Sequence, residues 1–250
     1  MSASAIPLSA EGSQVPVEMS ERDIREAIED YVSAARNAVE AGFDGVEIHG
    51  ANGYLPDQFL QSNSNERVDG WGGSVEKRCR FHLEVSRAVV ATVGAGRTAI
   101  RLSPWSDFLD MLMPDPVPTF THLVGELKKL ELGYLSLVEA RVRGNDDTDV
   151  AADKDVGWLV RLWDNTSPVF IAGGFNSETA AEAVDVTYRD YDVAIVFGRY
   201  FVSNPDLVYR LRERLVMEKY DRTVFYTPKL PEGYIDYPMS SGFVARSIGA

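Results

Sequence analysis

The chain has little of what crosslinks a protein or anchors it in a bilayer. Cys79 is its one cysteine, which excludes an internal disulfide. The sequence has no cluster of Cys and His with the spacing of zinc ligands, so no metal site is expected. No apolar run approaches the roughly 20 residues of a membrane-spanning helix. These absences leave an ordinary globular protein without metal.

Basic residues are scarce as well. Lys and Arg number 25 against 38 Asp and Glu, which gives a net charge of −13. Nucleic acids and anionic membranes bind basic surfaces, so neither is expected as a partner. Residues 1–20 have no basic flank and no continuous apolar stretch, so they do not form a secretory signal. We therefore expect a cytoplasmic protein, folded as a single domain over residues 1–250.

Strands and helices alternate along the chain. Short β-favouring apolar segments lie near residues 46, 100, 136, 170 and 195, and each is followed by a helical pattern. The predicted helices cover 21–41, 74–93, Thr119 or Thr121 to Leu132, 156–163, a segment from Ser177, and 206–215. Residues 1–19 are predicted as an irregular lead-in and 217–250 as an irregular tail. Such alternation predicts a parallel sheet with right-handed crossovers.

The predicted fold class is therefore α/β, of the (β/α) TIM-barrel type. A closed barrel of this type has eight strands, and this chain supplies about five βα units. We interpret the long segment from Pro104 to Pro118, rich in Asp, Met and Pro, as a substrate lid. The loop arginines Arg67, Arg78 and Arg80, with Asp69, are either a solvated charged surface or structural ion pairs, and we favour structural ion pairs over a role in chemistry.

Polar residues follow the first predicted strand, at residues 45–49. His49, Asn52 and Tyr54 come within six residues of one another. Catalytic groups of a β/α barrel lie at this end of the strands. Alternatively, His49 is a structural histidine, Asn52 a turn former and Tyr54 a core residue.

Two later strands run into glycines. The first is followed by Gly173 and Gly174 and then a helix, and the next by Gly198 and Arg199. Free backbone N–H groups at a helix N-terminus bind anions, and a guanidinium suits phosphate. Two successive turns of this kind predict a phosphate site, whereas either turn by itself is equally typical of a tight βα connection.

Longer motifs carry a specific resemblance. They read HGANGY from His49, DQFL from Asp57, SNERVD from Ser64, GGSVEKRCRF from Gly72, IRLSP from Ile100, AGGF from Ala172 and FGRYFVSNPDL from Phe197. In these motifs the chain closely resembles the Old Yellow Enzyme family of FMN-dependent, NAD(P)H-using ene-reductases built on a β/α barrel. Members of that family are longer, and the chain resembles their C-terminal part, without the first three βα units.

The resemblance implies roles for individual residues. His49 and Asn52 would donate hydrogen bonds to the substrate oxygen, and Tyr54 would deliver a proton. Arg101 would lie against the pyrimidine edge of FMN. The remaining implied residues are Gly173, Gly174, Gly198 and Arg199 at the FMN phosphate, and the aromatic pair Phe225 and Tyr226 near flavin and substrate, for which plain packing is an equal alternative.

Two functions follow from these implications. The first is an FMN-dependent oxidoreductase that passes a hydride from NADPH or NADH, through the flavin, to an α,β-unsaturated carbonyl compound. The second is a non-catalytic half-barrel, a pseudoenzyme or assembly partner that retains the family's residues. A homo-oligomer, or a partner chain that completes the barrel, is compatible with either function.

Overall fold

The computed structural model describes residues 1–140, 142–143, 146–147 and 154–248. The chain divides into two compact units. The first comprises Met1–Gly174 with Tyr188–Ala194, and the second comprises Phe175–Thr187 with Ile195–Ala250. The single domain expected from the length stays a prediction. In the described part of the chain, no helix is long and apolar enough to cross a membrane.

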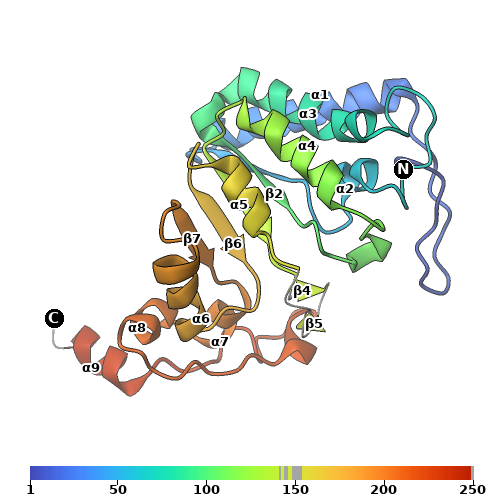
Figure 1. The fold of residues 1–250 in the computed structure, drawn as a ribbon. Helices are drawn as coiled ribbons and strands as arrows, with labels where there is room; N and C mark the ends of the chain where they lie inside the picture. Colours follow the sequence, from blue (N-terminus) through green and yellow to red (C-terminus); the bar gives the residue numbers. More distant parts are fainter. Residues whose placement is uncertain (141, 144–145, 148–153, 249–250) are drawn as a thin grey trace. The chain divides into compact units, whose positions relative to one another are not determined.

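The main strands form one five-stranded sheet (Figure 1). Its order is β1-β2-β3-β6-β7, and β1 to β6 are joined by parallel pairing. The strands are β1 Val46–His49, β2 Thr98–Leu102, β3 Tyr134–Val138, β6 Val169–Ala172 and β7 Val193–Val196. All five lie where the sequence predicts them, and the α/β, barrel-type prediction is confirmed.

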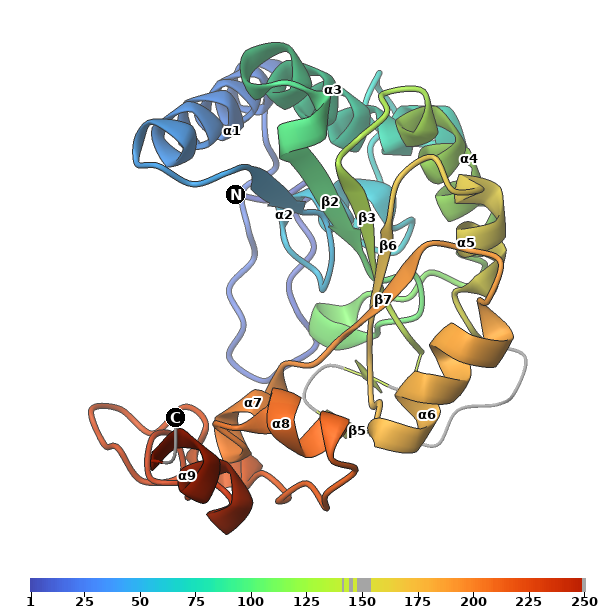
Figure 2. The same ribbon diagram turned by 90° about the vertical axis from the view of Figure 1, so that its left-hand side faces the viewer.

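Four helices cover one face of the sheet in the order in which they occur in the chain (Figure 2). Helix α1 packs on α3, α3 on α4, and α4 on α5. Their bounds are α1 Glu21–Glu40, α3 Val75–Val93, α4 Val117–Lys128 and α5 Gly157–Trp163. The strand side chains that face them are apolar and buried, as in the register Ile48, Ile100, Leu135 and Val169.

Local signals explain the starts of the two longest helices. Ser20 and Asp23 form a reciprocal capping box at α1, and Ser74 Oγ accepts the Lys77 N–H at α3. Helix α4 starts at Val117, earlier than Thr119 or Thr121, because Pro116 is the N-cap and Pro118 fits the first turn. The prediction of its start was wrong.

Several short elements lie where the sequence predicts loops or a longer helix. Helix α2, Leu55–Leu60, follows Tyr54 directly. Helix α8 covers only Leu207–Arg212, because Arg214 takes a left-handed φ of 53° that a helix does not continue through. The remaining helices are η1 Ala95–Arg97, η2 Phe108–Asp110, α6 Ser177–Glu182, the π-helix η3 Ala183–Thr187, α7 Arg199–Ser203 and η4 Arg222–Val224.

The C-terminal tail is not irregular throughout. Helix α9, Ser241–Ile248, lies within the predicted irregular segment 217–250. Its start is fixed because both the backbone N–H and the Oγ of Ser240 donate to Asp206, which also pairs with Arg210 at 2.8 Å. Most of the segment 139–152, which the sequence pattern assigns to a polar loop, lies outside the described residues. Within it, β4 Val142–Arg143 and β5 Asp146–Asp147 pair antiparallel.

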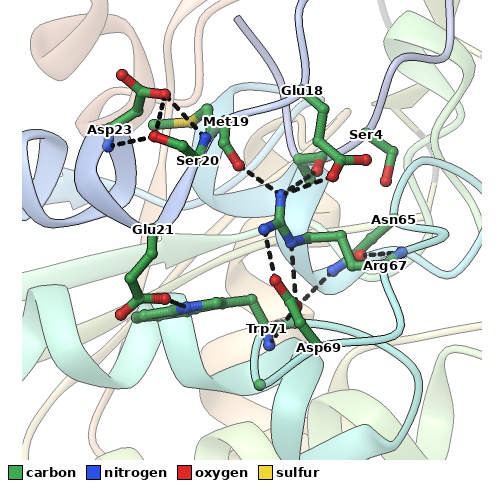
Figure 3. Close-up of polar contacts among 12 residues, drawn as sticks. Ser4, Glu18, Met19, Ser20, Glu21, Asp23, Asn65, Arg67, Asp69 and Trp71 are labelled. Carbon is green, nitrogen blue, oxygen red and sulfur yellow. Dashed lines mark hydrogen bonds and ion pairs between the residues drawn. The ribbon is translucent and has the colours of Figure 1, made fainter.

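Residues 1–19 are irregular apart from a bridge between Ser2 and Glu18, and Arg67 anchors them (Figure 3). The Arg67 guanidinium donates to the carbonyls of Ala3 and Met19 and forms a bidentate pair with Asp69, at 3.1 and 2.6 Å. Arg67 is buried, so these contacts fix the lead-in on the first unit.

The ion-pair prediction holds for Arg67 and Arg80, whereas Arg78 has no ion pair with any residue that the structure describes. Arg80 pairs with Glu84 at 2.6 Å. Arg78 instead donates to the carbonyls of Leu60 and Gly73 and to Thr119 Oγ1. These three uncharged acceptors each take one hydrogen bond, from Nε, Nη1 and Nη2, so the guanidinium is held without a carboxylate.

Candidate functional site

The site begins at the C-terminal end of β1. Side chains of a strand alternate between its faces, and here Ile48 is buried toward the helices while Glu47 and His49 are exposed on the other face. His49 is in register with Arg101 of β2, so both side chains leave the same face of adjacent strands. The sequence places these residues 52 positions apart, and the parallel pairing makes them neighbours.

The His49 imidazole is held in its neutral form. Its pKa is lowered first by partial burial and then by the Arg101 charge, against an opposing effect of Glu47. A neutral imidazole keeps one N–H donor at neutral pH. The Tyr54 ring lies beside it, with 4.9 Å between ring centroids and a tilt of 51°.

A tight turn connects His49 to Tyr54. Gly50 N donates to Arg101 O at 3.1 Å, and a Cβ on Gly50 would lie 2.8 Å from His82 Nε2, so only glycine fits there. Asn52 takes a left-handed φ of 55°, and its backbone N–H donates to Ser103 Oγ at 2.8 Å. Tyr54 is the N-cap of α2 and remains 51% exposed.

Throughout the described residues, no hydrogen bond is found for the His49 ring, the Asn52 carboxamide or the Tyr54 hydroxyl. Arg101 Nε is buried and likewise has no partner there. Buried donors are rarely left unsatisfied in a folded protein, so Arg101 Nε is available to the acceptor atom of a ligand or to water.

A flavin ring fits this donor set. Its pyrimidine edge carries carbonyl oxygens and a ring nitrogen, which accept from a guanidinium, and Arg101 presents a buried unpaired N–H. Deeper on the same face, Tyr134 stacks on Phe170 with ring centroids 4.4 Å apart. Burial, followed by the Glu47 charge and hydrogen bond, raises the pKa of Tyr134 to about 12, so the phenol stays neutral. Sequence reasoning missed Glu47, Tyr134 and Phe170, although the alternation of the strands places them on this face.

The first glycine turn is built differently from the prediction. Gly173 has a φ of 142°, and a Cβ there would lie 2.7 Å from Glu139 Cβ, so close packing requires glycine. Helix α6 does not begin with free N–H groups, because Asn176 Oδ1 accepts from Glu178 N and Thr179 N. The helix terminus therefore gives no support to a phosphate site, and the roles of Gly173 and Gly174 stay predictions.

The other predicted residues belong to the second unit. Gly198 is the N-cap of α7, and a Cβ there would meet open space. The Arg199 guanidinium lies 6.0 Å from the centroid of the Tyr220 ring. The centroid of the Phe225 ring lies 5.5 Å from the same point. Tyr226 is 80% exposed. The convergence of Gly198 and Arg199 with the glycines of the first unit stays a prediction.

Among the described residues, no group of three or more His, Cys, Asp or Glu side chains could hold a metal ion. The buried Cys79 has a pKa raised to about 12, mainly by burial, so its thiol is unreactive at neutral pH.

Comparisons with known proteins agree with the fold and with the resemblance. The chain is 52% identical over 243 residues to chanoclavine-I aldehyde reductase fgaOx3 of Penicillium roqueforti (strain FM164), covering 97% of this chain and 65% of that protein. It is 46% identical over 248 residues to the probable inactive dehydrogenase easA of Claviceps fusiformis, covering 97% of this chain and 65% of that protein. The chain thus spans about 65% of the length of these relatives.

A solved structure gives the same result. The old yellow enzyme homologue from Zymomonas mobilis superimposes with a TM-score of 0.84 at 34% identity, over 96% of this chain and 68% of that one. The profile of the NADH:flavin oxidoreductase / NADH oxidase family matches residues 2–218. The chain therefore belongs to the NADH:flavin oxidoreductase / NADH oxidase family, in which it resembles the Old Yellow Enzymes.

Proposed function

We propose that the chain carries the substrate-binding and proton-donating part of an FMN-dependent, NAD(P)H-using reductase of activated alkenes. One observation carries the proposal. His49, Asn52, Tyr54 and Arg101 meet at one end of the sheet, and their polar groups have no partner within the described residues. Unpaired donors that converge on an open face are suited to bind a small ligand that accepts hydrogen bonds.

FMN is the proposed cofactor. Arg101 would hold the pyrimidine edge, and Gly173, Gly174, Gly198 and Arg199 would hold the phosphate. When bound, FMN supplies the hydride to the β-carbon of the substrate. A positive charge at Arg101 favours a reduced, anionic ring, which is how a protein tunes a cofactor.

The chain's own residues would act on the carbonyl and the α-carbon. The neutral His49 imidazole and the Asn52 carboxamide donate to the carbonyl oxygen, where negative charge develops as the hydride arrives. Tyr54, half exposed beside His49, delivers a proton to the α-carbon as general acid. The fixed turn from Gly50 to Tyr54 keeps these groups at one strand end.

An α,β-unsaturated aldehyde is the proposed substrate class. The relative from Penicillium roqueforti is named an aldehyde reductase, which supports an aldehyde as the activating carbonyl. Phe225 and Tyr226 are proposed to contact the apolar part of the substrate. The uncharged N–H donors that His49 and Asn52 offer suit a carbonyl oxygen better than a carboxylate or phosphate.

A non-catalytic role is the second candidate. The relative from Claviceps fusiformis is named a probable inactive dehydrogenase, and the chain spans 65% of its length. Under this alternative the chain retains His49, Asn52, Tyr54 and Arg101 but neither binds flavin nor turns over a substrate.

Titration of the purified chain with FMN tests the proposal. Under the proposed function the flavin binds at one equivalent, and Arg101→Gln weakens binding because it removes the guanidinium. Addition of a phenol or an unsaturated aldehyde then perturbs the flavin spectrum, and His49→Ala or Asn52→Ala weakens that second binding step. Arg87→Gln, which removes a guanidinium from the exposed surface of α3, is the matched control. Absence of flavin uptake at excess FMN favours the non-catalytic role.

A further inference from the structure

A buried carboxylate lies directly behind the site. Asp57, on the first turn of α2, is fully buried, and within the described residues no cation pairs with it. Its two oxygens accept one hydrogen bond each. Gly53 N donates to Oδ2 at 2.9 Å, and Gln61 Nε2 donates to Oδ1 at 3.0 Å. The carboxylate therefore holds the backbone of the turn that carries Asn52 and Tyr54.

The network continues from Gln61 into the loop after β2. Gln61 is buried, and its Oε1 accepts the Met113 N–H at 2.9 Å. Met113 is itself buried, at 2% exposure. The donors all point toward Asp57: Gly53 and Gln61 donate to it directly, and Met113 donates to the amide that does so. Both side-chain oxygens of residue 57 must therefore accept a hydrogen bond.

The turn and the loop also contact each other directly. A Cβ on Gly53 would lie 2.6 Å from Leu109 Cβ and 2.9 Å from Phe108 O. Gln58 Nε2 donates to Gly53 O at 2.8 Å. Asn52 and Gly53 both have positive φ, 55° and 74°, in the left-handed region that asparagine and glycine adopt more readily than other residues. The predicted lid loop is therefore anchored here on the turn.

We propose that Asp57 is a positioning residue for the site, whose carboxylate locks the turn from Asn52 to Tyr54 onto the loop from Phe108 to Met113. The inference rests on the proposed function, because the residues that Asp57 would position are those assigned to substrate binding and proton transfer. Asp57 itself touches neither substrate nor cofactor. Its hydrogen bonds set the place from which Asn52 and Tyr54 act.

Exchange of the two partners tests this proposal. Asp57→Asn leaves an NH2 group facing another donor, either Gly53 N–H or the Gln61 amide, and breaks one bond. In the double variant D57N/Q61E every donor again faces an acceptor. The amide introduced by D57N would accept from Gly53 and donate to the carboxylate introduced by Q61E, whose other oxygen accepts from Met113. Net charge is also that of the wild type.

Amide hydrogen exchange, measured by NMR on the intact chain, is the first readout. We expect exchange at Gly53, at Met113 or at both to be about tenfold faster in Asp57→Asn, since one buried hydrogen bond is lost, and near wild type in D57N/Q61E. Asn65→Asp is the matched control. It perturbs buried bonds to the Phe59 and Trp71 carbonyls and should leave the ratio of Gly53 exchange to that of an α3 amide unchanged.

Steady-state reduction of an unsaturated aldehyde is the second readout. Asp57→Asn is expected to lower kcat about tenfold with little change in FMN binding, and D57N/Q61E to regain most of it. Unchanged exchange at both Gly53 and Met113 in Asp57→Asn, or no recovery in the double variant, overturns the proposal. If the wild-type chain shows no turnover, the proposed function fails, while the exchange measurements still decide whether Asp57 locks the turn.

Discussion

Replacing Asp57 by Asn should change how the stability of the protein depends on pH. Burial raises the pKa of the Asp57 carboxyl from 3.8 to about 6, and the bonds from Gly53 and Gln61 oppose that effect only in part. The folded chain therefore binds this proton more tightly than the unfolded chain. Stability from this group is fully present below pH 3.8 and is lost as pH rises through 6.

The magnitude follows from the two pKa values. Their separation corresponds to about 3 kcal/mol of the free energy of unfolding, lost between about pH 4 and pH 7. Asparagine does not titrate, so Asp57→Asn lacks this dependence. The free energy of unfolding of the wild type, minus that of the variant, should therefore fall by about 3 kcal/mol over this interval and stay level at higher pH.

Urea unfolding followed by tryptophan fluorescence provides the assay, since Trp71 and Trp163 are fully buried. Curves for both proteins at pH 4, 5, 6, 7 and 8 give the difference directly, and the other titrating groups cancel in it. A difference that does not change with pH would refute the claim that this carboxylate is desolvated and without a cation. A difference that rises with pH would mean that a cation stabilises it.

Three further predictions concern the scaffold around the site. Burial lowers the pKa of His82 to about 4. The free energy of unfolding of the wild type, minus that of His82→Gln, should therefore be highest above pH 6.5 and fall by about 3 kcal/mol toward pH 4 in urea titrations. A difference that rises toward pH 4 would contradict this prediction. Gly50→Ala should cost about 1–3 kcal/mol in thermal unfolding, because its Cβ would meet His82 Nε2 at 2.8 Å; an unchanged Tm would show that the space relaxes. Arg67→Ala should lower the free energy of unfolding by about 2 kcal/mol and speed proteolysis within residues 1–19, since the carbonyls of Ala3 and Met19 lose their donor. Equal cleavage rates in the two proteins would mean that other contacts hold the lead-in.

Local signals made most of the fold predictable. The capping residues Ser20 and Ser74 and the β-favouring runs at Val46 and Tyr134 depend on neighbouring residues only, and the structure has them as predicted. Helix α2 was missed because its six residues are too few to show a period and Pro56 reads as a turn former. Proline in a first helical turn is compatible with either interpretation.

The site could be predicted only in part, for a physical reason. His49, Asn52 and Tyr54 are close in sequence, so their meeting depends on one turn. The adjacency of His49 and Arg101 depends on the register of β1 and β2, which no local pattern shows. The importance of Asp57 was equally hidden, because a lone Asp in a helical motif gives no sign of being buried. The capping of α6 by Asn176, which removed one argument for a phosphate site, requires the structure.

The central claim is that Tyr54 delivers the proton while His49 and Asn52 bind the carbonyl oxygen. Stopped-flow measurement of the two half-reactions in Tyr54→Phe tests it most directly, with Tyr31→Phe, a tyrosine packed against Phe81 in the helix layer, as the control. We predict that Tyr54→Phe slows flavin reoxidation by an unsaturated aldehyde about 100-fold and leaves flavin reduction by NADPH nearly unchanged. Equal slowing of both half-reactions, or no flavin uptake by the wild-type chain at excess FMN, would contradict the account.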